Sequence, residues 1–415
     1  MSPPRTSFPK DQIEIVLLEG THQAGTAALE ADGFSVRTHT GALEGQALIN
    51  EIRRAHIVGI RSKTQLTDDI INQCERLLSI GCFCAGTNQV DLESAAARGI
   101  VVFNSPFSNT RSVAELTIAE IIALCRKLTA RSHALHQGIW DKSAAGSHEV
   151  RGKALGIIGY GHIGSQVSIL AEAMGMKVRF FDTLSKLPLG NAQAADSIDE
   201  LVRTSDVITI HVPDTDSTRS MFGKRQIAMM KPGSYLLNNA RGSIVDLDAM
   251  REAIESGHLA GGAVDVFPDE PAQSGESFSS PLQGLDNVIL TPHVGGSTIE
   301  AQEAISLDVA SKLTRFLNLG TTTGAVNVPE VDLPEQQLQD DQRSHRILNF
   351  HRNVPGVLNK IHEAAAELKI NITGQYLQTN AQIGYLVLDA DPSNAAALHE
   401  RIDAIEESIR TRILW

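Results

Sequence analysis

The sequence predicts an α/β protein of three parts, in which a doubly wound parallel-sheet domain is inserted in a flavodoxin-like domain and a ferredoxin-like domain follows. Residues 153–182 read as strand, glycine-rich turn, helix and second strand, the opening of a doubly wound sheet. Strand and helix patterns alternate from residue 13 on, which is typical of parallel sheets covered on both faces. Residues 345–415 are patterned strand-helix-strand-strand-helix-strand. A chain of 415 residues is also too long for one ordinary core.

Composition and charge are those of a soluble globular protein, with 42% hydrophobic and 20% charged residues. The net charge of −13 argues against nucleic acid or an anionic membrane surface as a partner. The four cysteines form no Cys-x-x-Cys pair, so we expect reduced thiols and no metal site. No run of about 18 apolar residues and no apolar signal segment occurs, which favours a cytoplasmic protein.

The glycine-rich turn carries the clearest chemical signal. An apolar run at residues 154–158 predicts a buried strand that leads directly into Gly159, Tyr160, Gly161, His162, Ile163 and Gly164. These glycines let backbone N–H groups approach a pyrophosphate at a helix N-terminus, and Asp182 ends the next strand, where it can accept from a ribose hydroxyl. Because a carboxylate repels a 2′-phosphate, we expect NAD rather than NADP. The alternatives are a structural turn and a solvated strand-end acid.

The first domain begins after a proline-containing arm, residues 1–12. We expect its strands at residues 14–18, 36–39, 57–60, 77–80 and 101–103. A helix at residues 67–75 would lie between two of them, with Thr67 as its N-cap. The basic turn Arg61-Ser62-Lys63 follows one strand directly. Since ligands of such sheets bind beyond the carboxyl ends of the strands, this turn is expected to face the crevice.

The inserted domain is expected to begin after a break at residues 104–106. Ser112 would cap a long apolar helix over residues 113–135, which we interpret as facing another domain or subunit. Trp140, in the loop that follows, is either a buried anchor or an exposed interface residue. Further strands of this domain are expected at residues 207–211, 235–238, 262–266 and 288–290, which makes six with the first two.

The chain is expected to leave the inserted domain at residues 294–297. A helix at residues 299–317 would return to the first domain, and the polar residues 329–343 read as a linker. C-terminal strands are expected at residues 347–351, 371–378, 383–388 and 411–414, with helices at residues 356–368 and 394–408. The expected domain bounds are residues 1–108, 109–295, 296–337 for the return and linker, and 345–415.

Three residues at separate strand ends are candidates for chemistry: Arg241, Glu270 and His293. Transfer of a hydride from an alcohol to NAD requires a base for the hydroxyl proton, and the pKa of histidine suits that task. A carboxylate partner would orient the imidazole, and an arginine can bind a substrate carboxylate with two hydrogen bonds. Taken singly, the three could also be a structural ion pair, a loop charge and a strand-end cap.

Several stretches resemble a known family. The segments GYGHIG with Asp182, NNARGSIVD, GGAVDVFPDEP and LTPHVGGS resemble the NAD-dependent D-2-hydroxyacid dehydrogenase family. GIRSKTQLT, IGCFCAGTNQVDL, FNSPFSNTRSVAE and HRNVPGVLNKI resemble its branch of short D-3-phosphoglycerate dehydrogenases with a C-terminal ACT domain. The resemblance extends from about residue 13 to residue 415.

The resemblance implies a catalytic set of Arg241, Glu270 and His293. The expected cofactor contacts are Gly159, Tyr160, Gly161, His162, Ile163, Gly164, Asp182, His211, Val212, Pro213, Asn239, Ala240, Arg241, Asp265, His293, Val294, Gly295 and Gly296. The expected substrate contacts are Arg61, Ser62, Lys63, Asn109 and Gln302. The expected serine contacts in the ACT domain are His351, Asn353 and Asn371. In a ferredoxin-like unit the segments at Asn353 and Asn371 can lie near one another. Because ACT domains usually pair edge to edge, the resemblance also implies that the serine lies between two subunits.

The resemblance implies oxidation of 3-phosphoglycerate to 3-phosphohydroxypyruvate, the first step of L-serine biosynthesis. It further implies a homotetramer, inhibition by L-serine and reduction of 2-oxoglutarate. Phosphate binding by Arg61 and Lys63 would require domain closure about the two crossing segments. Lys63 stands where arginine is usual, and Asn239 where a small residue is usual beside the nicotinamide. The alternatives are a related dehydrogenase acting on glyoxylate, hydroxypyruvate or 2-oxoglutarate, and an NAD-sensing binding protein of the kind that acts in transcriptional repression.

Overall fold

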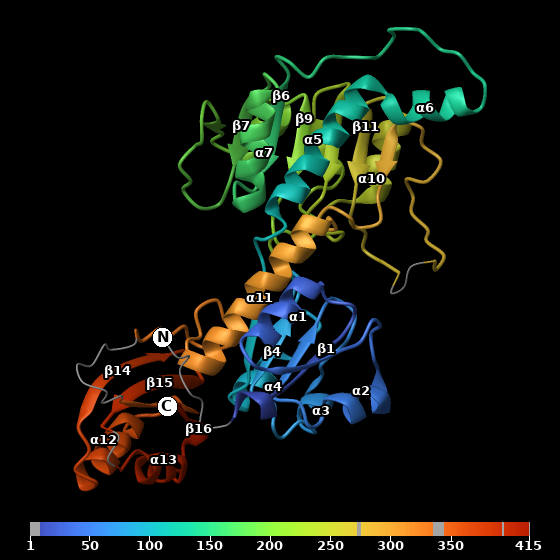
Figure 1. Ribbon diagram of the computed structural model, residues 1–415. Helices are drawn as coiled ribbons and strands as arrows, with labels where there is room; N and C mark the ends of the chain where they lie inside the picture. Colours follow the sequence, from blue (N-terminus) through green and yellow to red (C-terminus); the bar gives the residue numbers. More distant parts are fainter. Residues whose placement is uncertain (1–8, 272–274, 335–343, 392–393, 415) are drawn as a thin grey trace. The chain divides into compact units, whose positions relative to one another are not determined.

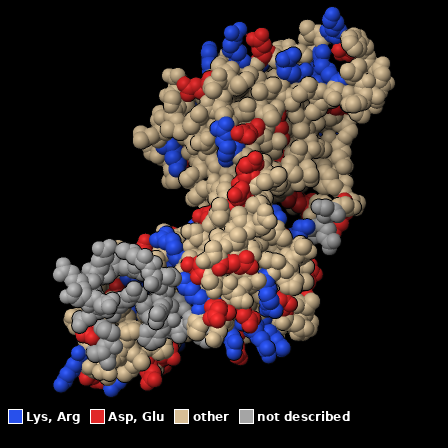
Figure 2. All heavy atoms as spheres, viewed as in Figure 1, with Lys and Arg blue, Asp and Glu red and all other residues tan. Residues whose placement is uncertain are grey.

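The computed structural model describes residues 9–271, 275–334, 344–391 and 394–414 (Figure 1). The chain forms two compact units: residues up to Ser108 join those from Gln302 onward, and Asn109–Ala301 form the other. Charged side chains of both signs are interspersed over the face seen in Figure 2. No helix among the described residues is long and apolar enough to cross a membrane.

The first unit contains a five-stranded parallel sheet of order β2-β1-β3-β4-β5, the flavodoxin-like order that the sequence predicts. Its strands are β1 Glu14–Leu17, β2 Ser35–Thr38, β3 Ile57–Ile60, β4 Ser79–Cys82 and β5 Val101–Asn104, and its helices are α1 Gln23–Ala31, α2 Gly45–Ile52, α3 Asp68–Ile71 and α4 Leu92–Ala97. Strand β4 begins two residues later than predicted, and the helix predicted at residues 67–75 is reduced to α3. Thr67 is the N-cap residue of α3, but its side chain makes no capping hydrogen bond.

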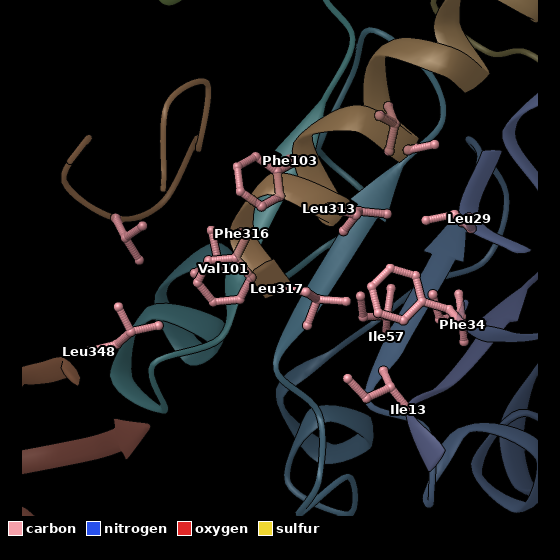
Figure 3. Packing of buried hydrophobic residues seen from close by; sticks show 14 of the residues in the cluster. Ile13, Leu29, Phe34, Ile57, Val101, Phe103, Leu313, Phe316, Leu317 and Leu348 are labelled. Carbon is pink, nitrogen blue, oxygen red and sulfur yellow. The ribbon is translucent and has the colours of Figure 1, made fainter. Parts of the chain in front are cut away.

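Both faces of this sheet are buried, because alternate residues of each strand enter different cores. Ile15 and Leu17 pack in one cluster, whereas Val16 and Leu18 pack in another. The first cluster is completed by α11 Ile299–Leu319, whose Leu313, Phe316 and Leu317 lie against the sheet (Figure 3). The predicted return of the chain to the first sheet is therefore confirmed.

The same unit carries a four-stranded antiparallel sheet of order β14-β15-β13-β16. The strands are β13 His345–Arg352, β14 Ile372–Thr379, β15 Ile383–Ala390 and β16 Ser408–Leu414, with helices α12 Val357–Glu367 and α13 Ala395–Asp403. This is the predicted ferredoxin-like pattern. Helix α13 ends five residues earlier than predicted, and β16 begins three residues earlier.

The second unit is built on a seven-stranded parallel sheet of order β12-β11-β10-β9-β6-β7-β8. The strands are β6 Ala154–Ile158, β7 Lys177–Phe181, β8 Gln193–Ala194, β9 Val207–Ile210, β10 Ser234–Asn238, β11 Leu259–Val264 and β12 Val288–Leu290, and the helices α7 His162–Ala173, α8 Ile198–Thr204, α9 Lys224–Met229 and α10 Leu247–Glu255. The sequence predicted six strands and missed the two-residue edge strand β8. A strand of that length leaves no readable periodicity.

The long helix predicted at residues 113–135 is wrong. Two helices, α5 Thr110–Arg126 and α6 Leu128–His136, are separated by Lys127, whose φ of 53° is left-handed and interrupts the helix. Ser112 is not the cap, because α5 begins two residues earlier and the Ser112 hydroxyl pairs with that of Thr298 at 2.8 Å. None of the α6 side chains is buried, and Trp140 is 80% exposed.

All four cysteines are free thiols, as predicted. Cys74, Cys82 and Cys125 are buried, and burial raises the pKa of Cys74 to about 11. The predicted linker lies outside the described residues at 335–343, and so does the predicted arm at 1–8. The earlier part of the linker is packed rather than loose, since Val331 is buried and its N–H bonds to Thr322.

Candidate active site

A histidine–glutamate pair lies at the carboxyl edge of the seven-stranded sheet. His293 follows β12 and Glu270 follows β11, its neighbour in the sheet, and His293 Nδ1 lies 2.7 Å from Glu270 Oε2. His293 has a φ of 53°, a left-handed conformation that is uncommon outside glycine and is often found at functional positions. Because Nδ1 faces the carboxylate, Nε2 is the nitrogen left to face a ligand.

The pair is electrostatically matched. The hydrogen bond that His293 donates to Glu270 raises the pKa of His293 above its ordinary value, although burial and the charge of Arg241 oppose this. Burial alone would raise the pKa of Glu270, but hydrogen bonds from His293 and from the backbone N–H of Phe267 outweigh burial and lower it. The arrangement therefore favours an ionised glutamate beside an imidazole that accepts a proton readily.

Arg241 lies at the end of β10, the next strand of the sheet. The side chain of Asn238 holds its turn, accepting from Ala240 N at 3.2 Å and donating to Arg241 O at 3.0 Å. At Gly242 a Cβ would lie 2.0 Å from the backbone of Phe267, so only glycine lets this turn pack against the segment that leads to Glu270. Arg241, Glu270 and His293 thus gather from three adjacent strand ends.

Asp265 organises the turn that carries His293. Its Oδ1 accepts from Thr291 Oγ1 at 2.6 Å and from Val294 N at 2.8 Å, and its Oδ2 accepts from Gly295 N at 2.8 Å. Both carboxylate oxygens are therefore engaged by the protein itself. The resemblance implies that Asp265 is a cofactor contact; the structure shows that it also holds the backbone of this turn.

The glycine-rich turn fits a dinucleotide. Gly159 has a φ of 91°, and a Cβ at Gly164 would lie 2.1 Å from Gly159 O, so the turn closes tightly against α7. At Gly161 a Cβ would meet nothing within 4 Å, which leaves the start of α7 open to a phosphate group. Asp182 accepts from Tyr160 N at 2.8 Å and is thereby fixed at the end of β7 beside the turn.

His211 lies behind the same turn. A Cβ on Gly159 would approach His211 O to 2.6 Å, and His211 Nε2 lies 3.0 Å from Thr209 Oγ1. Although part of the residue is exposed, Nδ1 is buried, and burial lowers the pKa of the ring to about 3. His211 is therefore neutral at physiological pH.

The predicted substrate contacts are divided between the two units. Arg61, Ser62, Lys63 and Gln302 belong to the first unit. Asn109 belongs to the second, at the N-cap position of α5, where its amide lies beside Gly296. Asn109 thus adjoins the turn that carries His293.

Comparison with known proteins gives the family. The D-isomer specific 2-hydroxyacid dehydrogenase NAD-binding domain matches residues 118–295, and the AHAS small subunit-like ACT domain matches residues 347–410. D-3-phosphoglycerate dehydrogenase of Escherichia coli (strain K12) is 51% identical over 414 residues, which are 99% of this chain and 100% of that protein. The Haemophilus influenzae enzyme of the same name is 49% identical over 412 residues, 99% of each chain.

The chain belongs to the D-3-phosphoglycerate dehydrogenase family. It is an NAD-dependent dehydrogenase with a C-terminal ACT domain. Among solved structures, D-lactate dehydrogenase from Aquifex aeolicus in complex with NAD and lactic acid matches 76% of this chain and 100% of its own, with a TM-score of 0.66 and 28% identity. D-2-hydroxyisocaproate dehydrogenase, at 24% identity and a TM-score of 0.69 over 76% of this chain and 99% of its own, shares the fold.

The basic turn at Arg61 is held in place by Glu19, a residue that the sequence analysis did not identify. Glu19 is buried, and its Oε1 accepts from Arg61 N at 3.2 Å and Thr64 N at 2.8 Å, while its Oε2 accepts from Lys63 N at 3.0 Å. Gln89 closes the other side by donating to Arg61 O at 2.6 Å. The sequence does contain one signal for this role, because Glu19 is an acidic residue two positions after the end of β1.

Asn239, which stands where the resemblance leads us to expect a small residue, has a structural explanation. Its side chain turns into the protein and donates to Glu120 Oε2 at 2.7 Å and to Thr117 Oγ1 at 3.1 Å, both on α5. The side chain therefore points away from a ligand, and only the backbone of Asn239 remains for one. No sequence pattern pointed to Glu120, which lies 119 residues away from Asn239.

The three residues predicted to bind serine do not meet within one ACT domain. His351 is buried on β13 with Nδ1 2.9 Å from Asn349 Oδ1, and Asn353 donates to Asn380 O at 2.7 Å just beyond the end of that strand. Asn371 precedes β14. Since Thr379 pairs with Gly384 and Ile372 with Ala390 on β15, the start of β14 lies at the opposite end of the sheet.

The expectation that Asn353 and Asn371 of one chain lie near one another is therefore wrong. The strand segment between Gly384 and Ala390 separates them by roughly 20 Å, at about 3.3 Å per residue.

Proposed function

We propose that the chain oxidises 3-phosphoglycerate to 3-phosphohydroxypyruvate, the first step of L-serine biosynthesis, and that L-serine bound at the ACT domains inhibits it. The observation that supports the proposed reaction is the His293–Glu270 pair, in which Nδ1 and Oε2 lie 2.7 Å apart. The charge of Arg241, at the adjacent strand end, lowers the pKa of both groups. The names of the two bacterial relatives support the choice of substrate.

His293 accepts the proton of the C2 hydroxyl through Nε2, because Glu270 occupies Nδ1. Glu270 holds the ring in place and stabilises the imidazolium that forms. Arg241 binds the C1 carboxylate, for which its planar guanidinium offers two parallel donors. Bound NAD supplies the acceptor for the hydride that leaves C2.

The cofactor is held by the glycine-rich turn and the segments beside it. Gly161 and the start of α7 take the pyrophosphate, Asp182 takes the adenosine ribose, and the backbone at Asn239 and at Gly295 adjoins the nicotinamide. His162, Ile163, Val212, Pro213, Ala240, Val294 and Gly296 complete this set.

Arg61 and Lys63 bind the phosphate of the substrate, and Ser62, Asn109 and Gln302 add polar contacts. The support is the way Glu19 uses three backbone N–H groups to hold this turn, so both cationic side chains stand on a fixed backbone. Lys63 provides charge without the planar fork of arginine, so Arg61 contributes the directional contact.

Serine binds between two ACT domains rather than within one. Strand β14 is an edge of its sheet and is largely exposed, so two copies can pair along it. In an antiparallel pairing of β14 with its counterpart, the start of one strand faces the end of the other. This brings Asn371 of one chain near Asn353 and His351 of the second, which one chain alone does not achieve.

A homotetramer uses a second contact besides the ACT pairing. Leu128, Leu135, Ile139 and Trp140 are exposed apolar residues grouped on α6 and the loop after it, as expected for a surface that another subunit covers. The protein acts in the cytoplasm. It also reduces 2-oxoglutarate, whose second carboxylate suits the basic turn.

The test is NADH oxidation with 3-phosphohydroxypyruvate, compared with hydroxypyruvate, glyoxylate and 2-oxoglutarate. A charge-assisted contact of about 1.5–3 kcal/mol predicts that kcat/KM is about 10–150-fold higher with the phosphate than with hydroxypyruvate. Equal values for the two acids would contradict the phosphate role. Absence of turnover with every acid would favour an NAD-sensing protein.

The regulatory part is tested by titrating L-serine into the same assay. We expect inhibition with a coupling free energy of about 1–3 kcal/mol, weakened in Asn353→Ala and Asn371→Ala. The control is Asn359→Ala, an exposed asparagine on α12. An intact enzyme that does not respond to serine would leave the ACT domain as an assembly module.

A further inference from the structure

A buried polar cluster lies directly behind the turn that carries Arg241. Asn239 donates to Glu120 Oε2 at 2.7 Å and to Thr117 Oγ1 at 3.1 Å, and the Thr117 hydroxyl donates in turn to Val113 O at 2.9 Å. The exposed fractions are 0% for Thr117, 3% for Glu120 and 6% for Asn239. The cluster therefore joins helix α5 to the catalytic turn in a place closed to solvent.

Two acceptors of this cluster lack partners. Glu120 Oε1 and Asn239 Oδ1 are both buried, and neither receives a hydrogen bond within the part of the chain that the structure describes. A buried acceptor without a donor costs about 1–3 kcal/mol, and native proteins rarely leave two on residues that already contact one another. A hydrogen carried by the glutamate itself would satisfy this pair of atoms.

The surroundings of Glu120 also disfavour its charge. The pKa of Glu120 is raised to about 8, chiefly by burial; the hydrogen bond from Asn239 opposes the rise, and the negative charge of Asp265, on the segment after β11, adds a smaller increase. No cation among the described residues acts on this carboxyl group. An ionised Glu120 would thus be an unpaired buried charge near a second carboxylate.

We propose that Glu120 is a positioning residue that is held as a neutral acid and pairs with Asn239 to fix the turn that carries Arg241. The neutral acid donates to Asn239 Oδ1 while it accepts from Asn239 Nδ2, so the acid and the amide form two hydrogen bonds with one another. This inference rests on the proposed role of Arg241 in binding the substrate carboxylate.

The position of Asn239 affects Arg241 and Glu270 through the turn at residues 239–242. Asn239 is followed by Ala240 and Arg241, and the side-chain amide of Asn238 hydrogen-bonds to the backbone of both Ala240 and Arg241. The next residue, Gly242, packs against the backbone at Phe267, whose N–H binds Glu270. A displaced Asn239 therefore moves Arg241 and disturbs the segment that orients the partner of His293.

The test compares four variants in the phosphohydroxypyruvate assay. Glu120→Ala removes the carboxyl partner of Asn239, leaves only the contact with Thr117, and should lower kcat/KM by about 10–100-fold, as expected for a misplaced catalytic group. Glu120→Gln offers the same donor and acceptor as the neutral acid and should stay within about threefold of the unmodified enzyme at pH 7. Glu120→Ala combined with Asn239→Ala removes both partners and should recover most of the loss. Glu115→Gln, an exposed glutamate on the same helix, is the control.

A second measurement does not depend on activity. Infrared spectra of the holoenzyme should contain a band of a protonated carboxyl group that disappears above about pH 8 and is missing from Glu120→Gln at every pH. If phosphohydroxypyruvate is not turned over, the proposed function fails, but this band still tests the neutral acid.

Three results would overturn the inference. A Glu120→Gln variant as impaired in kcat/KM as Glu120→Ala would mean that a charge is required. A double variant that loses as much kcat/KM as Glu120→Ala, or more, would mean that the loss does not come from an Asn239 without its partner. Spectra without the carboxyl band would mean that Glu120 is ionised. If Glu120→Ala does not fold, the glutamine variant and the spectra decide alone.

Discussion

A buried acid that stays neutral has a measurable effect on stability, and Glu120→Gln isolates it. Glu120 is 3% exposed, and its pKa is raised from 4.5 to about 8 in the folded chain. Below pH 4.5 the acid is protonated in both the folded and the unfolded states, so its contribution to stability is fully present. As the pH rises from 4.5 to about 8, the unfolded chain releases the proton and the folded chain keeps it, so stability falls.

The size of this effect follows from the shift. At about 1.36 kcal/mol per pH unit, the interval from 4.5 to pH 7 corresponds to about 3 kcal/mol lost by the unmodified protein. Glutamine cannot ionise and keeps the pairing with Asn239, so Glu120→Gln avoids the loss. The variant should therefore be more stable at pH 7, by up to about 3 kcal/mol, and the difference should level off above about pH 8.

The assay is denaturant unfolding followed by circular dichroism between pH 5 and pH 9, with Glu115→Gln as the exposed control. The stability difference between Glu120→Gln and the unmodified protein should grow steadily up to about pH 8, whereas the control should follow the unmodified protein throughout. A difference that is constant over this range, or one that shrinks as the pH rises, would refute the reasoning because it would mean that Glu120 does not hold its proton.

Four further predictions concern the site. His293→Ala should lower kcat by about 10²–10⁴-fold while NADH binding, followed by fluorescence, stays largely intact, as expected for loss of a general base; near-normal turnover would remove His293 from the mechanism. Asp182→Ser should narrow the preference for NAD over NADP in kcat/KM, and an unchanged ratio would place Asp182 away from the ribose. Arg61→Ala should raise KM for 3-phosphohydroxypyruvate by about 10–150-fold more than for hydroxypyruvate. Glu19→Ala should also raise KM for 3-phosphohydroxypyruvate more than for hydroxypyruvate, because it releases the backbone of that turn. Equal increases in KM for the two acids would show that the turn does not bind the phosphate.

Much of the fold could be predicted because its signals are local. The run 154–158, the glycines after it and the acid at Asp182 lie within one βαβ unit, so the sequence determined both the unit and the cofactor. Strand β3 and strand β12 begin and end where the sequence predicts, because both are short apolar runs bounded by polar or turn residues.

The misses have physical causes. Residues 113–135 were predicted as a single helix because their apolar pattern continues through Lys127. Only the left-handed backbone conformation of Lys127 shows that the helix is divided into α5 and α6. The predicted meeting of Asn353 and Asn371 failed because β13 and β14 are both antiparallel to β15 and so run parallel, which places the end of β13 and the start of β14 at opposite ends of the sheet.

The candidate site divides in the same way. The sequence by itself determined which residue types follow the strand ends, and it therefore identified Arg241, Glu270 and His293 as candidates. Only the tertiary structure decided what supports them: Asn239 meets Glu120 across 119 residues, and Glu19 meets Lys63 across 44. Periodicity and turn chemistry act over a few residues, whereas the partner of a buried polar side chain is set by the packing of segments far apart in the chain, which no local pattern records.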